Sequence, residues 1–152
     1  TYGMFGNSDG ANDCFFARFP NTTIPQGATI SSVKLTFQAA FTSTGTVCNA
    51  NVYFNDVDNA TAPTTYTEAN DKAVTAAISW NSVVGWTANS DYDSPSIVSI
   101  LQAIVNRPGW ASGQAMMVLV KNNSSSLDAR RHPKTYEAST TLCARLVVTY
   151  TT

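Results

Sequence analysis

Apolar and polar residues alternate over much of the chain, and two segments, 31–39 and 46–54, show it most clearly. A period of two places apolar side chains on one face of a β-strand and polar side chains on the other. The residues predicted to point inward are Val33, Leu35, Phe37 and Ala39 in the first segment and Cys48, Ala50, Val52 and Phe54 in the second. Both segments are therefore predicted to be half-buried strands.

Four further segments are predicted strands, and polar stretches separate them. The strands are 14–19, 76–80, 115–121 and 142–150, of which 115–121 is almost continuously apolar and is predicted to be buried on both faces. Pro25 and Gly27 indicate a turn. The polar stretches 55–74 and 122–140 are predicted to be surface excursions that build no core element.

One segment, about 95–106, has the pattern of an amphipathic helix. Its apolar residues recur at helical spacing: Ile97, Ile100, Leu101, Ile104 and Val105. Ser94 is predicted to cap it and Pro95 to be its first residue, with Asp91 and Asp93 near its positive end. Residues 106–109, Asn-Arg-Pro-Gly, end it. We expect this helix to cover one end of the core.

Together these elements predict an all-β fold with one domain over residues 1–152. The expected architecture is a jelly-roll-like antiparallel β-sandwich with a single short helix. At 152 residues the chain is long enough for one sizeable core.

Charged residues make up only 12% of the chain, about half the usual share. A surface built from Ser, Thr and Asn suits neutral partners such as glycans or other protein surfaces. Nine basic against ten acidic residues leave no basic patch for nucleic acid. No apolar run approaches the ~20 residues of a membrane helix, so neither nucleic acid nor membrane is an expected partner.

Candidate catalytic residues are few. His132 is the only histidine, and Pro133 after it favours an extended or turn conformation. Glu68 and Glu137 are the only glutamates, and their positions do not suggest a pair of acid and base carboxylates. We therefore expect no enzymatic activity.

Aromatic residues offer a candidate glycan site. Trp86 and Tyr92 lie among polar residues and could stack on sugar rings, with Asn89 supplying hydrogen bonds. Trp80 and Trp110 are instead predicted to pack in the core.

Asp56 and Asp58, within NDVDNA (55–60), carry the hard oxygen ligands that calcium prefers. The loop lacks the glycine and the distal glutamate of an EF-hand, so a solvated turn is the stronger interpretation and a structural calcium the alternative. No other cofactor is expected.

Arg130 and Arg131 follow a serine-rich loop and could anchor a subunit contact, although a solvated loop explains them equally well. The cysteines are Cys14, Cys48 and Cys143. An odd number allows at most one internal disulfide, and small buried apolar residues are the favoured interpretation.

Several longer motifs resemble a known group of proteins. They are RFPNTTIPQGATI (18–30), DNATAPTTYTE (58–68), IVNRPGWASGQAM (104–116), SSSLDARR (124–131) and ARLVVTY (144–150). The chain resembles non-catalytic β-sandwich modules of the DNRLRE and carbohydrate-binding type, most closely versions encoded by tailed phages. Relatives carry YDGS before the last strand, where this chain has YEAS (136–139).

The resemblance implies a virion structural module, either a capsid decoration protein or a component of a tail or fibre. Such a module would lie on the virion surface, contact a major capsid or tail protein and form a homo-oligomer, with a trimer favoured. The alternative is a carbohydrate-binding module of a secreted or cell-surface protein.

Overall fold

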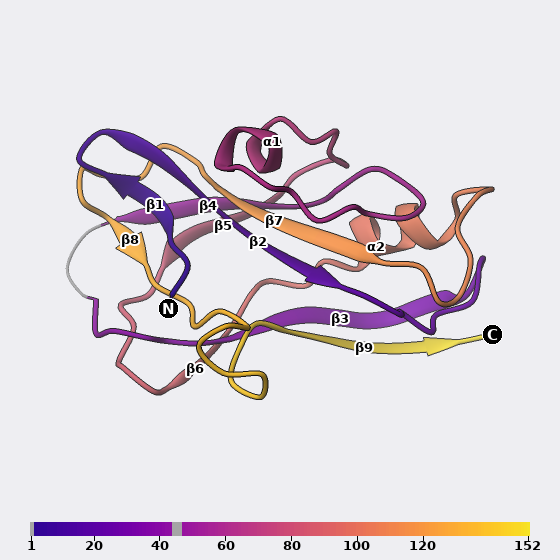
Figure 1. Cartoon of the computed structure of the whole chain (residues 1–152). Helices are drawn as coiled ribbons and strands as arrows, with labels where there is room; N and C mark the ends of the chain where they lie inside the picture. Colours follow the sequence, from indigo (N-terminus) through magenta and orange to yellow (C-terminus); the bar gives the residue numbers. More distant parts are fainter. Residues whose placement is uncertain (1, 44–46) are drawn as a thin grey trace.

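The computed structural model describes residues 2–43 and 47–152 and is mostly β (Figure 1). A curled antiparallel sheet of six strands has the order β5-β4-β7-β2-β1-β8, and a smaller antiparallel sheet has the order β6-β3-β9. The strands are β1 (Phe5–Ser8), β2 (Ala11–Phe19), β3 (Thr29–Gln38), β4 (Cys48–Phe54), β5 (Ile78–Val83), β6 (Asp91–Asp93), β7 (Met116–Asn122), β8 (Arg130–Arg131) and β9 (Arg145–Thr151). The two helices are α1 (Tyr66–Asn70) and α2 (Val98–Val105).

The alternating pattern of β3 and β4 predicted their inward faces correctly. All eight apolar side chains named for these two segments are buried. In β7, residues 116–120 are buried on both faces, as expected for a strand that lies between β4 and β2 in the larger sheet. Residue 46 of the predicted segment 46–54 lies outside the described residues.

Both sheets contribute to one core, in which aromatic rings are prominent. Phe37 of β3 packs against Trp80 of β5, with their ring centroids 5.9 Å apart and nearly parallel. Phe5 of β1 lies 5.7 Å from both Trp80 and Trp86. Trp80 and Trp110 are buried, which confirms their predicted core positions.

Helix α2 begins later than predicted. Its N-cap is Ile97, with no side-chain capping bond. Ser94 is instead bonded to Leu35 of β3: its N–H donates to the Leu35 carbonyl at 2.8 Å, and its Oγ accepts from the Leu35 N–H at 3.0 Å. Backbone pairing with a strand has taken the place of the predicted cap. The five predicted apolar residues are all buried, and α2 packs against β3 and β4.

The polar stretch 55–74 holds a second helix, α1, which the sequence did not predict. Thr65 caps it by accepting from the Glu68 N–H at 3.1 Å. Glu68 in turn accepts from the Thr64 N–H at 2.8 Å. Glu68 also accepts from the Lys72 ammonium at 2.9 Å, and the hydrogen bonds from Thr64 and Lys72 lower the pKa of Glu68 to about 2. Ala69 of α1 is buried, so this stretch does pack onto the sheet, above β2 and β7 in Figure 1.

Two of the motifs bind each other where α2 ends. The indole Nε1 of Trp110 donates to the Ile24 carbonyl at 3.0 Å, and the Gln26 side chain donates to the Arg107 carbonyl at 2.7 Å. The Gly27 N–H donates to the Val105 carbonyl at 2.9 Å. We call this the IPQG–RPGW junction; its conspicuous sequence is explained by packing and backbone hydrogen bonds.

Neither helix in the described part of the chain is long and apolar enough to cross a membrane.

Candidate functional site

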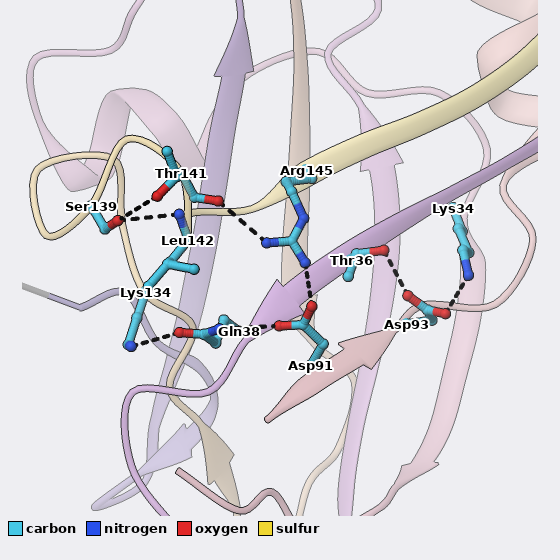
Figure 2. Close-up of polar contacts among 10 residues, drawn as sticks. All are labelled: Lys34, Thr36, Gln38, Asp91, Asp93, Lys134, Ser139, Thr141, Leu142 and Arg145. Carbon is cyan, nitrogen blue, oxygen red and sulfur yellow. Dashed lines mark hydrogen bonds and ion pairs between the residues drawn. The ribbon is translucent and has the colours of Figure 1, made fainter. Parts of the chain in front are cut away.

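The outer face of the three-stranded sheet carries a continuous set of polar side chains, which we call the polar row. Because Val33, Leu35 and Phe37 point into the core, the residues between them in β3 point outward. The polar row consists of Lys34, Thr36 and Gln38 of β3, Asp91 and Asp93 of β6, Arg145 of β9 and Lys134 (Figure 2).

Within the row, each aspartate is paired with a cation on another strand of the sheet. Asp93 pairs with Lys34 and accepts from the Thr36 hydroxyl at 2.6 Å. The hydrogen bonds from Lys34 and Thr36 hold the pKa of Asp93 below its usual value. Asp91 pairs with Arg145 at 2.5 Å. Exposed ion pairs of this kind add little to stability, which makes this face a candidate for binding.

Asp91 and Asp93 were predicted to lie at the helix N-terminus, and that prediction is wrong. They belong to β6, and their carboxylates bond to side chains of β3 and β9. Helix α2 starts only at Val98. A three-residue strand has too short a pattern to be recognised beside a strong helical stripe.

The row continues past the end of β3 through Lys134. Its ammonium donates to Gln38 Oε1 at 2.6 Å and to Asn89 Oδ1 at 2.8 Å. Asn89 has a positive φ of 65°, a conformation that asparagine tolerates better than most residues. Asn89, a predicted glycan ligand, therefore lies on this face with its side chain directed to Lys134.

Beyond Lys134 the same face carries three aromatic rings, Tyr2, Phe41 and His132, which we call the aromatic cluster. The backbone of 132–134 pairs with the end of β3 on one side and with Tyr2 on the other. Directly opposed residues share a face of a sheet, so the side chain of Tyr2 is on the same face as that of Lys134. The ring centroids of Tyr2 and Phe41 are 4.6 Å apart, and His132 lies 5.3 and 5.5 Å from them.

The aromatic cluster is both open to solvent and uncharged near neutral pH. Tyr2 is 49% exposed and Phe41 46% exposed. Burial of the imidazole, with the nearby Arg130 and Arg131 charges, lowers the pKa of His132 below its ordinary 6.5. Within the described residues, His132 Nδ1 has no hydrogen-bond partner. The imidazole therefore acts here as a neutral ring.

This lowered pKa predicts a pH dependence of stability. The unfolded chain binds the proton more readily than the folded one, so the contribution of His132 is fully present above pH ~6.5 and is lost as pH falls toward the lowered folded pKa. We expect the free energy of unfolding to decline between pH 7 and pH 5, and His132→Phe, which keeps a ring, to flatten that decline. Urea unfolding at each pH measures it; equal slopes for both proteins would contradict the assignment.

Trp86 is fully buried, so its ring is not available to stack on a sugar, contrary to the prediction. It is stacked on Tyr92, with ring centroids 5.1 Å apart and planes 8° from parallel. The Tyr92 hydroxyl accepts from the Thr87 N–H at 2.7 Å. Both rings are therefore part of the packing beneath β6. The polar neighbours of Trp86 in sequence indicated a loop but not the direction of its side chain.

Arg131 is also buried, at 1% exposure, and does not lie on an interface surface. Its guanidinium donates to the carbonyls of Val83 and Val84 at 2.6 and 2.8 Å, which connects β8 to the end of β5. Arg130 is partly exposed, bonds to the Ser8 hydroxyl and lies 4.0 Å from Asp128. Of the predicted interface pair, only Arg130 reaches solvent.

Asp56 and Asp58 converge, as the calcium prediction requires, but on a guanidinium. Arg107 pairs with Asp56 and, through Nε, with Asp58 at 2.6 Å. The hydrogen bond to Asp58 is the main cause of a raised pKa for Arg107. Gly109 packs directly on this pair, since a Cβ there would lie 2.2 Å from Asp58 Oδ2. A cation at these carboxylates would have to displace Arg107, and the calcium site stays a prediction.

Sequence reasoning missed the aromatic cluster. Tyr2 and Phe41 lie outside every predicted strand, and His132 was considered only as a catalytic residue. These three rings come into contact only because three segments far apart in the sequence pair with one another. A local sequence pattern cannot predict such pairing. Chemically, the polar row and the aromatic cluster together combine a ring surface with adjacent hydrogen-bond donors and acceptors. Comparison of the chain with models of known protein families and with curated protein sequences finds no match.

Proposed function

We propose that the chain is a non-catalytic recognition module of the jelly-roll class, and that it binds a glycan on the outer face of the three-stranded sheet. The observation that carries the proposal is the continuity of the exposed aromatic cluster with the polar row. A sugar ring has an apolar C–H face and a rim of hydroxyls. Tyr2 and Phe41 match the face, while Gln38, Asn89 and Lys134 match the rim.

The electrostatics of the face support a neutral or weakly charged ligand. Both aspartates of the polar row are paired with a cation, and His132 is neutral at pH 7. A site with a ring surface and a few fixed polar groups is typical for small polar ligands. The surroundings of His132 support a non-catalytic role, since its ring packs against the rings of both Tyr2 and Phe41.

Replacement of Phe41 tests this proposal. We expect Phe41→Ala to weaken binding by about tenfold, because truncating a central aromatic removes most of its contact energy. Binding is measured by affinity electrophoresis against cellulose, xylan, mannan and α-glucan. The side chain is 46% exposed, so the fold should survive, and circular dichroism checks that.

Tyr66→Ala is the matched control, because Tyr66 is an exposed aromatic on α1, on the other sheet. It should leave glycan binding unchanged. Equal losses in both variants, or no retention by any of these polysaccharides, would count against a glycan site at the aromatic cluster.

A virion structural role is the second candidate. We propose it as a capsid decoration or a tail or fibre component, assembled as a homo-oligomer on a major capsid or tail protein. Support comes from apolar side chains left exposed outside the polar row, among them Phe16 at 39% and Tyr136 at 65%. Purified particles should contain the chain at a copy number that matches a capsid or tail lattice. Its loss on mild washing would argue against this role.

A further inference from the structure

A cleft of about 670 Å³ opens between β2 and the segment 134–144, and Lys134 is the one residue that it shares with the polar row. Its lining is mostly apolar and includes Phe15, Phe16, Phe19, Pro20, Tyr136 and Ala144. Cys14 also lines it, and burial raises the pKa of that thiol to about 11, so it stays neutral. The cleft thus presents a largely uncharged floor.

One edge of β2 faces this cleft without a strand beside it. β1 pairs with β2 only over Ala11–Asp13, whereas β7 pairs with Cys14–Phe19 on the opposite edge. Over Cys14–Phe19 the free edge has no strand partner among residues 2–43 and 47–152. Exposed edges of this length are normally covered or broken by charge or proline, and here Arg18 is the only charge.

The register shows which backbone groups are free. The Asn55 N–H donates to the Met117 carbonyl at 2.8 Å, so Met117 directs its backbone groups toward β4. In an antiparallel ladder the direction alternates along the strand. Val118 and Val120 therefore bond to their β2 partners Ala17 and Phe15. The N–H and C=O groups of Cys14, Phe16 and Arg18 are left to point to the free edge.

The smaller sheet is open on the same side. β9 pairs with β3 alone, and its inward side chains Leu146, Val148 and Tyr150 are only half-buried. On the other side of the molecule α2 fills the corresponding space by packing against β3 and β4.

Charge indicates the chemistry of the occupant. Arg18 and Lys134 both line the cleft, and neither is paired with a carboxylate within the described part of the chain. Arg18 bonds through Nε to the Ala60 carbonyl at 2.7 Å, and Lys134 bonds to neutral side chains. Glu137 on the opposite wall is the only carboxylate that lines the cleft, which leaves one positive charge in excess.

We propose that this cleft binds an extended segment of a partner protein, with alternating apolar side chains and flanking carboxylates, which adds as a strand to the free edge of β2. Its backbone pairs with Cys14, Phe16 and Arg18, its apolar side chains cover Ala17 and Phe19, and a carboxylate meets Arg18. Addition of a strand to an open edge is an established mode of peptide recognition. The site is separate from the aromatic cluster and holds whether or not a glycan binds there.

The probe is a synthetic peptide, acetyl-Glu-Val-Thr-Val-Thr-Val-Glu-amide, titrated into the whole chain and followed by amide hydrogen exchange. Before addition, the amides of Phe16 and Arg18 should exchange fast and those of Phe15 and Ala17 slowly. With peptide, exchange at Phe16 and Arg18 should slow at least tenfold. Protection that fails to appear at these two amides, or that appears equally at all positions of β2, would overturn the proposal.

Peptide variants test the mode of binding without altering the protein. With the valines directed inward, the threonine N–H groups face β2, so N-methylation of both threonines should abolish binding. Replacement of both glutamates by lysine should weaken it about fivefold. Equal binding by all three peptides would show nonspecific apolar adsorption and overturn the proposal.

Protein variants separate this site from the others. Arg18→Glu should weaken binding of the original peptide about fivefold, whereas Lys121→Glu makes the same change in charge outside the cleft and should not. Phe41→Ala should leave peptide binding unchanged even if it abolishes glycan binding. A dimer in sedimentation that protects Phe16 and Arg18 without peptide would assign the edge to a second copy and overturn the partner proposed here.

Discussion

Trp110→Ala should lower the free energy of unfolding by about 3–5 kcal/mol, the usual cost of truncating a buried tryptophan. Trp110 is 2% exposed, and its indole donates to the Ile24 carbonyl. Removing it leaves a cavity in the IPQG–RPGW junction and a buried carbonyl without its donor. Since whole domains are stable by about 5–15 kcal/mol, this change removes a large share. Urea unfolding followed by circular dichroism measures it.

Two further variants isolate the causes. Trp110→Phe keeps most of the ring and loses the hydrogen bond, so we expect a smaller loss of about 1–3 kcal/mol. Tyr136→Ala, at a ring that is 65% exposed, should change stability by less than about 0.5 kcal/mol. If Trp110→Ala behaved like Tyr136→Ala, the junction would not be a stabilising contact.

Gly6→Ala should lower the free energy of unfolding by at least about 3 kcal/mol. Gly6 in β1 has a φ of +119°, which residues with a Cβ rarely adopt. A Cβ there would also lie 2.2 Å from the Ala129 carbonyl oxygen, which is backbone and cannot rotate away. The variant must therefore separate β1 from β8, and thermal unfolding should show a markedly lower Tm.

Gly113→Ala is the matched control for Gly6→Ala. Gly113 has a similar φ of +98°, but a Cβ there meets no atom within 4 Å. Gly113→Ala has the conformational cost of a positive φ without a steric clash, so it should lower the free energy of unfolding by about 1–2 kcal/mol. Comparable losses at the two positions would mean that the β1–β8 contact can relax and that backbone strain alone matters.

The elements that could be predicted from sequence are those whose pattern is local and long. β3, β4 and β7 each span seven residues or more; the burial of β3 and β4 followed their alternation, and that of β7 followed its continuous apolar run. The stripe of α2 identified its buried face, but its start was misplaced because Ser94 pairs with Leu35, a tertiary contact that competes with capping. β1, β6 and β8 have two to four residues, too few for a period to be recognised.

Site residues were harder to predict, because exposure is decided by neighbours distant in the chain. Trp86 and Phe41 are both aromatic residues outside predicted strands, yet Trp86 is fully buried and Phe41 is 46% exposed. The difference lies in Phe5 and Tyr92, which enclose Trp86. Asn89 lies on the outer face whereas its neighbour Trp86 points inward, and the local sequence does not indicate this difference.

The pairing of β2 with β7 has a consequence for how the chain is made. Cys14 lies opposite Lys121, and β1 meets β8 through Phe5 and Arg131. During synthesis β2 cannot pair with β7, nor β1 with β8, until more than a hundred later residues have left the ribosome. Chains dominated by such distant contacts fold slowly and expose unpaired edges meanwhile. We therefore expect recombinant yield to improve at low temperature and with co-expressed chaperones, which shield the nascent amino-terminal hairpin.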